Sequence, residues 1–462
     1  MEIDTLIKNA KVVSSCLIVE ADVAIKDGKF VSIATESCSY TAEQVIDARG
    51  SFVLPGIIDE HCHTLDLGMS ELEDFITGST AAAIGGVTTV LEMPLTIPPT
   101  ITARDFEDKK AIASTRFLID FALYGGVVPG NQAEIPKMVE AGAIGFKGMM
   151  AGSVPGLYDI LDDGSLMESF KVISQCKSII CLHAENEAII NHLEKKLRAK
   201  GRNDIQAYFM SRPIISELEA VSRAIMLAEE TRCPLHFAHI SSPQSVQLIQ
   251  QKKAEGQNIT CETCPQYLVL NQGMDNLGPY IKFAPPARSK SETQEMWELL
   301  SRGDIETLGS DHGPHTKENK EKGWKNIWDA GNGSMGIETM LPIMLSEGVN
   351  KGRISIQRLV ALLCENPARR FGIYPRKGTI QVGSEADIVI VDMEKEIVVK
   401  AEMLHSKHKH TPYDYLSIKG VPILTMVRGE VIVDNGDVMR KPGYGEFVVP
   451  QAVLGHYIGE QE

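Results

Sequence analysis

The stretch GIIDEHCHTLD, residues 56–66, joins a short apolar run to two histidines that are one residue apart. If the run forms a β-strand, side chains two positions apart point to the same face, so His61 and His63 lie together. Two neutral imidazoles that converge on one point are typical of a metal site. Because His-x-His pairs also occur by chance on solvated strands, the pair alone does not distinguish these two interpretations.

Seven more apolar runs of strand length follow the first, and segments of helical length, such as ELEAVSRAIMLAEE, separate them. The runs are GVTTVLEMP (86–94), FLIDFALYGGV (117–127), GAIGFKGMM (142–150), SIICLHAEN (178–186), PLHFAHISS (234–242), NITCETCPQ (258–266) and IETLGSDHG (305–313). Apolar strands that alternate with helices predict a parallel sheet in an α/β fold. Eight such strands predict a (β/α)8 TIM-like barrel.

The sequence pattern at both ends of the chain differs from that of the middle. Short strand patterns with turn signals fill the N-terminal residues, and similar patterns return after a last helical segment in ADIVIVDM and ILTMVRGEVIVDNG. Neither end alone offers enough strands to bury both of its faces. We therefore predict a small β-sandwich domain built from residues 1–53 plus 374–462, beside the predicted barrel of residues 54–373.

The composition excludes several classes of partner. The 462 residues carry a formal net charge of -15 and contain no block rich in lysine and arginine, which disfavours nucleic acid and anionic membrane surfaces. The N-terminal sequence lacks a signal-peptide pattern, and no apolar run is long enough to span a membrane, so a soluble, cytoplasmic protein is expected. The nine cysteines are an odd number, which favours free thiols over a disulfide framework.

Metal-competent and titratable side chains recur at the carboxyl ends of the predicted strands, where barrels of this kind carry their chemistry. These residues are His61, His63, Lys147, His183, His239 and Asp311. Taken singly, Lys147 could pair with a buried acid and His183 could be a satisfied core histidine. Together at one rim, the six residues favour a metal centre. A lysine among metal ligands makes sense only if it is neutral or has become an anionic carbamate, because an ammonium repels cations.

The motifs DEHCH, GFK, CLHAEN, HFAHISS and GSDHGPH occur in this order across nearly the whole chain. The set resembles the cyclic amidohydrolases of the amidohydrolase superfamily, a group of allantoinases, hydantoinases or dihydropyrimidinases, and dihydroorotases. The resemblance implies two divalent metal ions, usually zinc, with manganese, cobalt or iron as alternatives. It also implies a small cyclic ureide as substrate and a homotetramer.

Carried over position by position, the resemblance gives each candidate residue a role. His61, His63 and Asp311 would hold one metal ion, His183 and His239 would hold the other, and a carboxylated Lys147 would bridge both. It also places Asn332 and Gly333, in AGNGSMG, among the loop groups that bind the substrate. The remaining histidines are not expected to bind metal. His236 should point away from the site, and the cluster in HSKHKHTPYD should form a solvated face or a sheet edge.

Asp311 is also the predicted catalytic residue. Amide hydrolysis needs a base that accepts a proton from the attacking water and then an acid that protonates the departing ring nitrogen. One carboxylate can do both in turn, while the neighbouring His312 should face away. Beside dications, the pKa of Asp311 is expected to lie below its ordinary value.

The substrate is less clearly specified. Leu65 and Leu95 stand where dihydroorotases carry an arginine and an asparagine for a substrate carboxylate, so that activity is disfavoured. Gly152 and Ala284 replace a tyrosine and a serine typical of hydantoinases, whereas NGSMGIE and YPRKGTIQVGSEADIVIVD resemble hydantoinases. LEMPL and HKHTPYD resemble allantoinases, apart from Thr96, where those enzymes often have asparagine.

On this balance the sequence predicts hydrolysis of allantoin to allantoate, a step of purine and ureide catabolism. A hydantoinase or dihydropyrimidinase is the alternative reading. A non-catalytic scaffold related to dihydropyrimidinases is a third reading, which the retention of all six candidate ligands disfavours.

Overall fold

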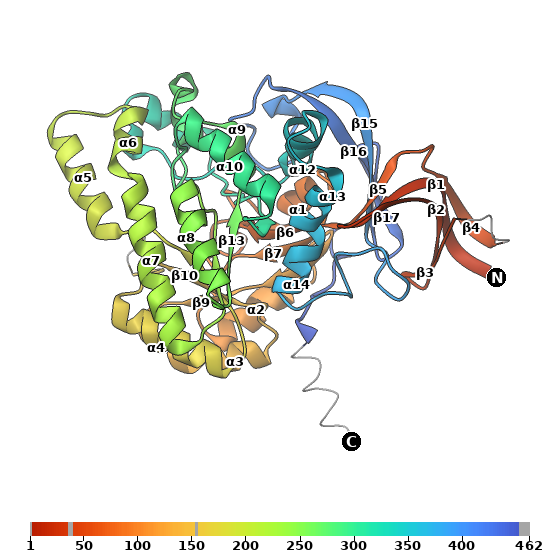
Figure 1. Ribbon diagram of the computed structural model, residues 1–462, viewed down its shortest axis with the longest axis horizontal. Helices are drawn as coiled ribbons and strands as arrows, with labels where there is room; N and C mark the ends of the chain where they lie inside the picture. The colour runs from red at the N-terminus through yellow and green to blue at the C-terminus, as the bar shows by residue number, and fades with distance from the viewer. Residues whose placement is uncertain (1, 36–39, 153–155, 452–462) are drawn as a thin grey trace.

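The computed structural model describes residues 2–35, 40–152 and 156–451. Figure 1 shows two regions side by side: a helix-covered region that contains β6 to β14, and a sheet that contains both β1 and β16. The architecture is mixed α/β, as the sequence predicts. Within the described residues, no helix combines the length and the apolar character needed to cross a membrane.

The helix-covered region contains two sheets of parallel strands. The first sheet has the order β6 (Ile57–Cys62), β7 (Val87–Glu92) and β8 (Asp120–Leu123). The second runs from β9 (Gly125–Val127) through β10 (Phe146–Met149), β11 (Ile180–His183), β12 (Leu235–Phe237) and β13 (Ile259–Thr263) to β14 (Thr307–Leu308). The strands are almost entirely buried, which is why their sequences are continuous apolar runs instead of alternating patterns.

The two parallel sheets are linked at both of their margins. Only Tyr124 separates β8 from β9, so one predicted strand contributes to both sheets. At the other margin, Cys62 forms a parallel bridge with His312, and the His63 N–H donates to the His312 carbonyl at 2.9 Å. The end of β6 therefore lies beside the segment that follows β14.

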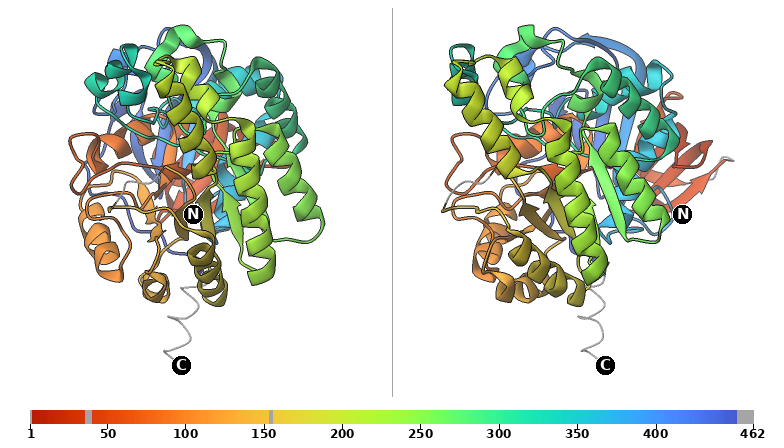
Figure 2. Two further views of the ribbon diagram at one scale, coloured as in Figure 1. Left: turned by 90° about the vertical axis from the view of Figure 1, so that its left-hand side faces the viewer. Right: turned by 60° about the vertical axis from the view of Figure 1, so that its left-hand side comes forward.

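Helices form an outer layer over these strands (Figure 2). They include α1 (Phe75–Ile84), α2 (Ala103–Ala113), α3 (Ile135–Glu140), α4 (Asp163–Gln175), α5 (Glu187–Ala199), α6 (Ile205–Ser211), α7 (Ile214–Thr231), α8 (Pro243–Ala254) and α10 (Lys290–Arg302). Further helical segments are α9 (Pro265–Val269), η2 (Asp275–Ile281), α11 (Lys317–Glu321), α12 (Met340–Ile343) and η5 (Met344–Asn350). The predicted last helix is present as α13 (Ile356–Val360), η6 (Ala361–Glu365) and α14 (Asn366–Arg370).

The sequence specifies where many of these helices begin. Side-chain oxygens of Asp74, Thr102, Asp162, Ser242 and Ser289 each accept a hydrogen bond from a backbone N–H of the first turn. Such caps satisfy N–H groups that have no partner inside the helix. Of these helices, α1 and α8 start after the loops that carry His63 and His239.

Strands from both ends of the chain form one nine-stranded sheet. The N-terminal strands are β1 (Glu2–Val13), β2 (Ile18–Lys26), β3 (Lys29–Ala34), β4 (Thr41–Asp47) and β5 (Phe52–Pro55). The C-terminal strands are β15 (Ile388–Val398), β16 (Ser417–Val427), β17 (Glu430–Asp434) and β18 (Asp437–Val438). The two groups join where β5 pairs antiparallel with β15, from Phe52 opposite Val391 to Pro55 opposite Ile388. The two ends do fold together, whereas their separation as a sandwich domain stays a prediction.

Buried charges connect this sheet to the parallel strands. The Lys377 ammonium donates to Asp120 at the start of β8 and to Asp387, both at 2.6 Å, and Arg428, just after β16, also pairs with Asp120. Paired in this way, the buried charges avoid the cost of isolated ones. The eight cysteines that the structure describes are all free, as predicted.

Candidate active site

All six candidate residues line one cavity of about 360 Å³ at the carboxyl ends of the parallel strands. His61 lies in β6 with His63 just after it, Lys147 lies in β10, and His183 ends β11. His239 follows β12 by two residues, and Asp311 follows β14 by three. The structure therefore brings together side chains from five strands, as the sequence predicts.

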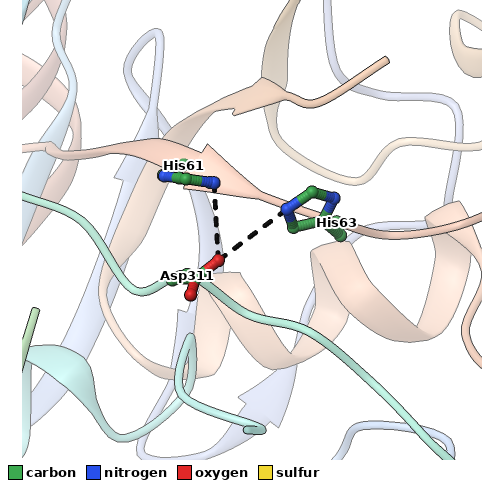
Figure 3. Close-up of side chains that lie close together, drawn as sticks. All are labelled: His61, His63 and Asp311. Carbon is green, nitrogen blue, oxygen red and sulfur yellow. Dashed lines mark ion pairs between the residues drawn. The ribbon is translucent and has the colours of Figure 1, made fainter. Parts of the chain in front are cut away.

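One half of this group is centred on Asp311 (Figure 3). Its Oδ1 atom lies 3.4 Å from His61 Nε2 and 3.8 Å from His63 Nε2. One donor atom from each of the three residues falls within 4.8 Å of the others, close enough to share a metal ion. Asp311 has a φ of +47°, a left-handed conformation that is uncommon for a residue other than glycine and that often marks a functional position.

The other half contains His183, His239 and Lys147. His183 Nδ1 lies 3.1 Å from His239 Nε2, and Lys147 Nζ lies 3.4 Å from His61 Nε2. Lys147 is buried among imidazoles and makes no ion pair with any carboxylate of the described residues. A buried ammonium in such surroundings is unfavourable, so the position suits a neutral or carboxylated lysine.

The ionisation of the site also fits a metal centre. Burial lowers the pKa of His61, His63 and His239 well below the ordinary imidazole value, and this keeps their nitrogen lone pairs free. Neutral imidazoles with a carboxylate are donors that zinc and related divalent ions prefer. Burial raises the pKa of Asp311 to about 8, with the charge of Lys147 acting in the opposite direction. The predicted lowering of this pKa needs cations beside the carboxylate and stays a prediction.

Two buried glutamates, which the sequence reasoning missed, hold the outer sides of the histidines. Glu262 Oε1 lies 3.1 Å from His61 Nδ1 and accepts the His239 backbone N–H, also at 3.1 Å. Glu185 Oε2 lies 2.9 Å from His183 Nε2 and also accepts a hydrogen bond from Arg212. A carboxylate on the outer nitrogen fixes the tautomer and the orientation of a metal-binding imidazole.

These two glutamates differ in their charge environment. Although burial acts to raise it, the Arg212 guanidinium and the His183 hydrogen bond hold the pKa of Glu185 at about 2. Burial and the neighbouring Glu60 raise the pKa of Glu262 to about 8. Glu185 is thus anionic at neutral pH, whereas Glu262 becomes anionic there only if added positive charge in the cavity, such as bound metal, lowers its pKa.

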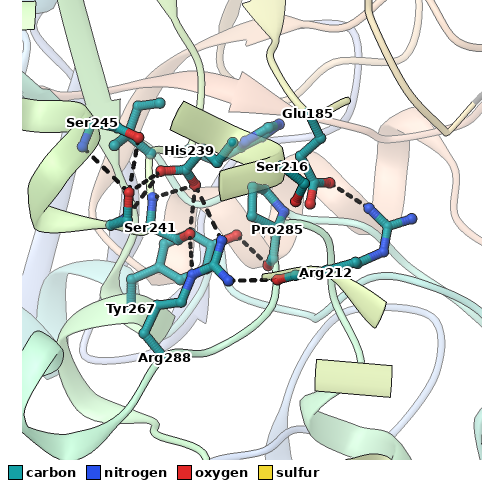
Figure 4. A network of polar contacts seen from close by, with 12 residues as sticks. Glu185, Arg212, Ser216, His239, Ser241, Ser245, Tyr267, Pro285 and Arg288 are labelled. Carbon is teal, nitrogen blue, oxygen red and sulfur yellow. Dashed lines mark hydrogen bonds and ion pairs between the residues drawn. The ribbon is translucent and has the colours of Figure 1, made fainter. Parts of the chain in front are cut away.

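A deeper polar network supports the loops around His239 (Figure 4). Glu217, on α7, accepts hydrogen bonds from the backbone N–H and hydroxyl groups of both Ser241 and Ser242. Arg288 donates to the Ser241 hydroxyl at 2.9 Å and to the Arg212 carbonyl at 2.6 Å. The loop after β12 is therefore fixed on the side away from the cavity.

The rest of the cavity wall is largely apolar. Its apolar side chains include Leu65, Met69, Leu72, Pro94, Leu95 and Met149, and Tyr158, Arg212 and His315 add polar groups to the lining. The cavity is also lined by four residues to which the family resemblance drew attention: Gly152, Ala284, Asn332 and Gly333. The Thr96 hydroxyl instead donates to the Pro98 carbonyl at 2.8 Å, and this side chain is fully buried. The departure at Thr96 therefore does not change the cavity surface directly.

The remaining histidines differ from their predicted placement in one case. His236 lies outside the cavity lining, as predicted, and its Nε2 is 3.5 Å from Glu60. His405 is exposed, as predicted for a solvated face, and His408 is partly exposed. His410 is buried, and its Nε2 contacts the His315 carbonyl at 2.8 Å, so the prediction of a solvated side chain was wrong there. The neighbouring lysines suggested a solvated segment, and the local sequence gives no sign of the contact with the distant loop that contains His315.

Comparison with known proteins gives consistent matches over nearly the whole chain. The profile described as "Amidohydrolase family" matches residues 52–432. An L-hydantoinase from Paenarthrobacter aurescens is 49% identical over 96% of this chain and 98% of its own length. An allantoinase from Rubrobacter xylanophilus is 36% identical over 94% of this chain and 95% of its own. The solved L-hydantoinase (dihydropyrimidinase) from Arthrobacter aurescens superposes with a TM-score of 0.96 at 49% identity, covering 97% of this chain and 100% of that one.

Proposed function

Because the chain belongs to the amidohydrolase family and is a hydrolase of cyclic amides, we propose that it is a hydantoinase that opens 5-substituted hydantoin rings. Hydrolysis of the ring C–N bond would give the corresponding N-carbamoyl amino acid. The sequence reasoning preferred allantoin. The 49% identity to an L-hydantoinase, against 36% to an allantoinase, supports the alternative reading better.

The observation that carries this proposal is the apolar wall beside the histidines. Allantoin presents a polar ureido group at the ring carbon where a hydantoin carries its side chain. Leu65, Leu72 and Leu95 would leave such a group without hydrogen-bond partners, whereas an apolar substituent would gain from burial. Complete burial of a side chain such as benzyl is worth about 1.5–3 kcal/mol, or roughly 10- to 150-fold in kcat/KM.

We propose that the six candidate residues hold two divalent metal ions in the arrangement given by the family resemblance. His61, His63 and Asp311 would hold one ion, His183 and His239 the other, and carboxylated Lys147 both. Two such ions supply an acidified water molecule and a polarised ring carbonyl. The distances around Asp311 and the unpaired, buried Lys147 support this assignment.

Asp311 is the proposed proton shuttle. Its carboxylate faces the cavity between His61 and His63, where it can accept a proton from the attacking water and pass it to the leaving ring nitrogen. His312 is fully buried, does not line the cavity, and has its Nε2 3.5 Å from Glu73. Asn332 and Gly333 also line the cavity, where their backbone groups could pair with the ring amides.

The finer architecture also remains a proposal. We propose that the two parallel sheets form one (β/α)8 barrel of residues 54–373, which the shared strand around Tyr124 and the Cys62 bridge to His312 support. The terminal sheet would then be the separate domain of residues 1–53 plus 374–462. Zinc, the carbamate and a homotetramer rest on the family resemblance, and elemental analysis, intact-mass measurement and light scattering test them in turn.

A substrate panel tests the function. We expect kcat/KM for 5-benzylhydantoin to exceed that for allantoin at least about tenfold, with dihydrouracil and dihydroorotate lower still. Leu95→Ser should reduce the preference for benzylhydantoin over unsubstituted hydantoin. Leu17→Ser is the control and should not change this preference, because Leu17 is 53% exposed and lies between β1 and β2, outside the cavity lining. Allantoin as the best substrate would restore the sequence-based reading, and no hydrolysis of any ring would refute both.

A further inference from the structure

Three side chains bind the backbone of the segment Ala330–Gly333, whose last two residues line the cavity. Each of its four successive carbonyl oxygens accepts a side-chain hydrogen bond. Ala330 accepts from Lys282, Gly331 from Lys320 at 3.1 Å, Asn332 from His315 at 2.8 Å, and Gly333 from Lys320 at 2.8 Å. Four consecutive carbonyls bound in this way make a segment with little freedom to rotate its peptide planes.

Lys320 is the centre of this arrangement. It is 1% exposed, and its Nζ also donates to the Lys282 carbonyl at 3.0 Å, which gives three carbonyl partners in all. Three partners match the three N–H groups of an ammonium one for one. Lys320 has no ion pair with an acid of the described residues, so carbonyl dipoles alone compensate its charge. Burial and the nearby Lys282 lower its pKa well below the ordinary value, which the three hydrogen bonds oppose.

The Lys320 bonds also determine the direction of an N–H group. A trans peptide is planar, so its C=O and N–H point in opposite directions. Lys320 binds the Gly331 carbonyl, and the Asn332 N–H of the same peptide therefore points away from Lys320. This N–H has no hydrogen-bond partner among the residues that the structure describes, whereas Gly331 N–H donates to Asn319 and Gly333 N–H to the Lys282 carbonyl. Asn332 lines the cavity.

We propose that Lys320 is a positioning residue that directs the Asn332 N–H toward a carbonyl oxygen of the bound ring. The inference rests on the proposed function, because the acceptor of this hydrogen bond would be a carbonyl group of a bound cyclic amide. Lys320 itself does not line the cavity and acts only through the segment Ala330–Gly333.

Kinetics of Lys320→Met, compared with Lys317→Met, test the proposal. Lys317 lies on the same helix, is 53% exposed in its side chain and, among the described residues, forms an ion pair with Glu321 alone. We expect Lys320→Met to raise KM for the best hydantoin about ten- to hundredfold with a smaller change in kcat, because a substrate hydrogen bond is misdirected. Bound metal should stay at the wild-type level, and Lys317→Met should match wild type throughout. An unchanged KM in metal-replete Lys320→Met would overturn the proposal.

A second variant and a second readout keep the test decisive. Lys320→Gln retains two N–H donors, so its KM should lie between wild type and Lys320→Met, and it serves if the methionine variant does not fold. Hydrogen–deuterium exchange of the full-length protein should show faster exchange at Gly331 and Gly333 in either variant, but not in Lys317→Met. This readout needs no substrate. If wild type opens none of the rings, the proposed function fails, while unchanged exchange in the Lys320 variants would by itself refute the positioning role.

Discussion

Glu262 offers a sharp test of how the candidate metal site is supported. Its Oε1 atom is the partner of both His61 Nδ1 and the His239 N–H, each at 3.1 Å, and the side chain is fully buried. Glu262→Gln keeps the shape and one acceptor oxygen but removes the negative charge that, in the metal-bound protein, would favour a donating Nδ1–H. Loss of such an outer-shell partner weakens metal binding by about 10- to 100-fold, equivalent to roughly 1.4–2.7 kcal/mol.

Glu262→Leu should have a larger effect. It leaves the imidazole N–H and the backbone N–H buried without an acceptor, at a cost of about 1–3 kcal/mol each. The stability of the metal-free protein should therefore fall by up to about 6 kcal/mol, which thermal or urea unfolding would detect. In Glu262→Gln, where an acceptor remains, most of that stability should be retained.

The assay is a competition between the protein and a chelator of known zinc affinity, with bound metal measured after equilibration. Glu60→Gln is the matched control, because Glu60 is equally buried, lies next to His61 in sequence, and makes no hydrogen bond to a candidate ligand. We expect Glu60→Gln to change metal affinity by less than about threefold. Equal affinities in the Glu60→Gln and Glu262→Gln proteins would refute the supporting role of Glu262.

Three further outcomes are expected. Lys147→Ala should lose most of its metal and activity by elemental analysis and kinetics, with partial rescue by excess short carboxylic acids; full activity would remove the carbamate from the mechanism. Asp311→Asn should retain much of its metal while kcat falls by about two to four orders of magnitude and the acidic limb of the pH–kcat profile disappears; near-native turnover would assign the shuttle to another group, with His315 the next candidate. Gly333→Ala should raise KM at least about tenfold at constant metal content, because its φ is +153° and a Cβ would lie 2.3 Å from the Gly313 carbonyl oxygen; an unchanged KM would mean that the segment can shift without cost.

The parallel strands and the six candidate ligands were predictable for one reason: both depend on local sequence. A strand buried on both faces needs a continuous apolar run, and a ligand at its carboxyl end follows that run directly, as His183 follows Ile180–Leu182. The same reasoning explains why the break at Tyr124 was missed, since the apolar run continues through it. The need to bury both faces predicted that strands from the two ends would pack together. It did not predict which strands pair or which residues lie opposite each other.

The supporting residues could not be predicted in the same way. Glu262 lies on β13, a strand that contributes no candidate ligand, and its role appears only when β6 and β12 lie beside it. Lys320 occurs in the charged sequence KENKEK, which is typical of a solvated helix, yet this one side chain is buried against carbonyls of a loop. Contacts between distant segments thus determine the roles of these residues, and spacing along the chain gives no signal for them.

The pairing of β5 with β15 has a consequence for the order of folding. During synthesis β5 emerges early and can pair with β1, but its other edge stays without a partner until residues 388–391 have been made. Until then that edge presents free N–H and C=O groups beside Val53 and Leu54, both fully buried in the finished protein. Open apolar edges recruit strands from other chains. A nascent or truncated chain that ends before β15 should therefore aggregate, whereas the complete chain protects the same edge with its own last strands.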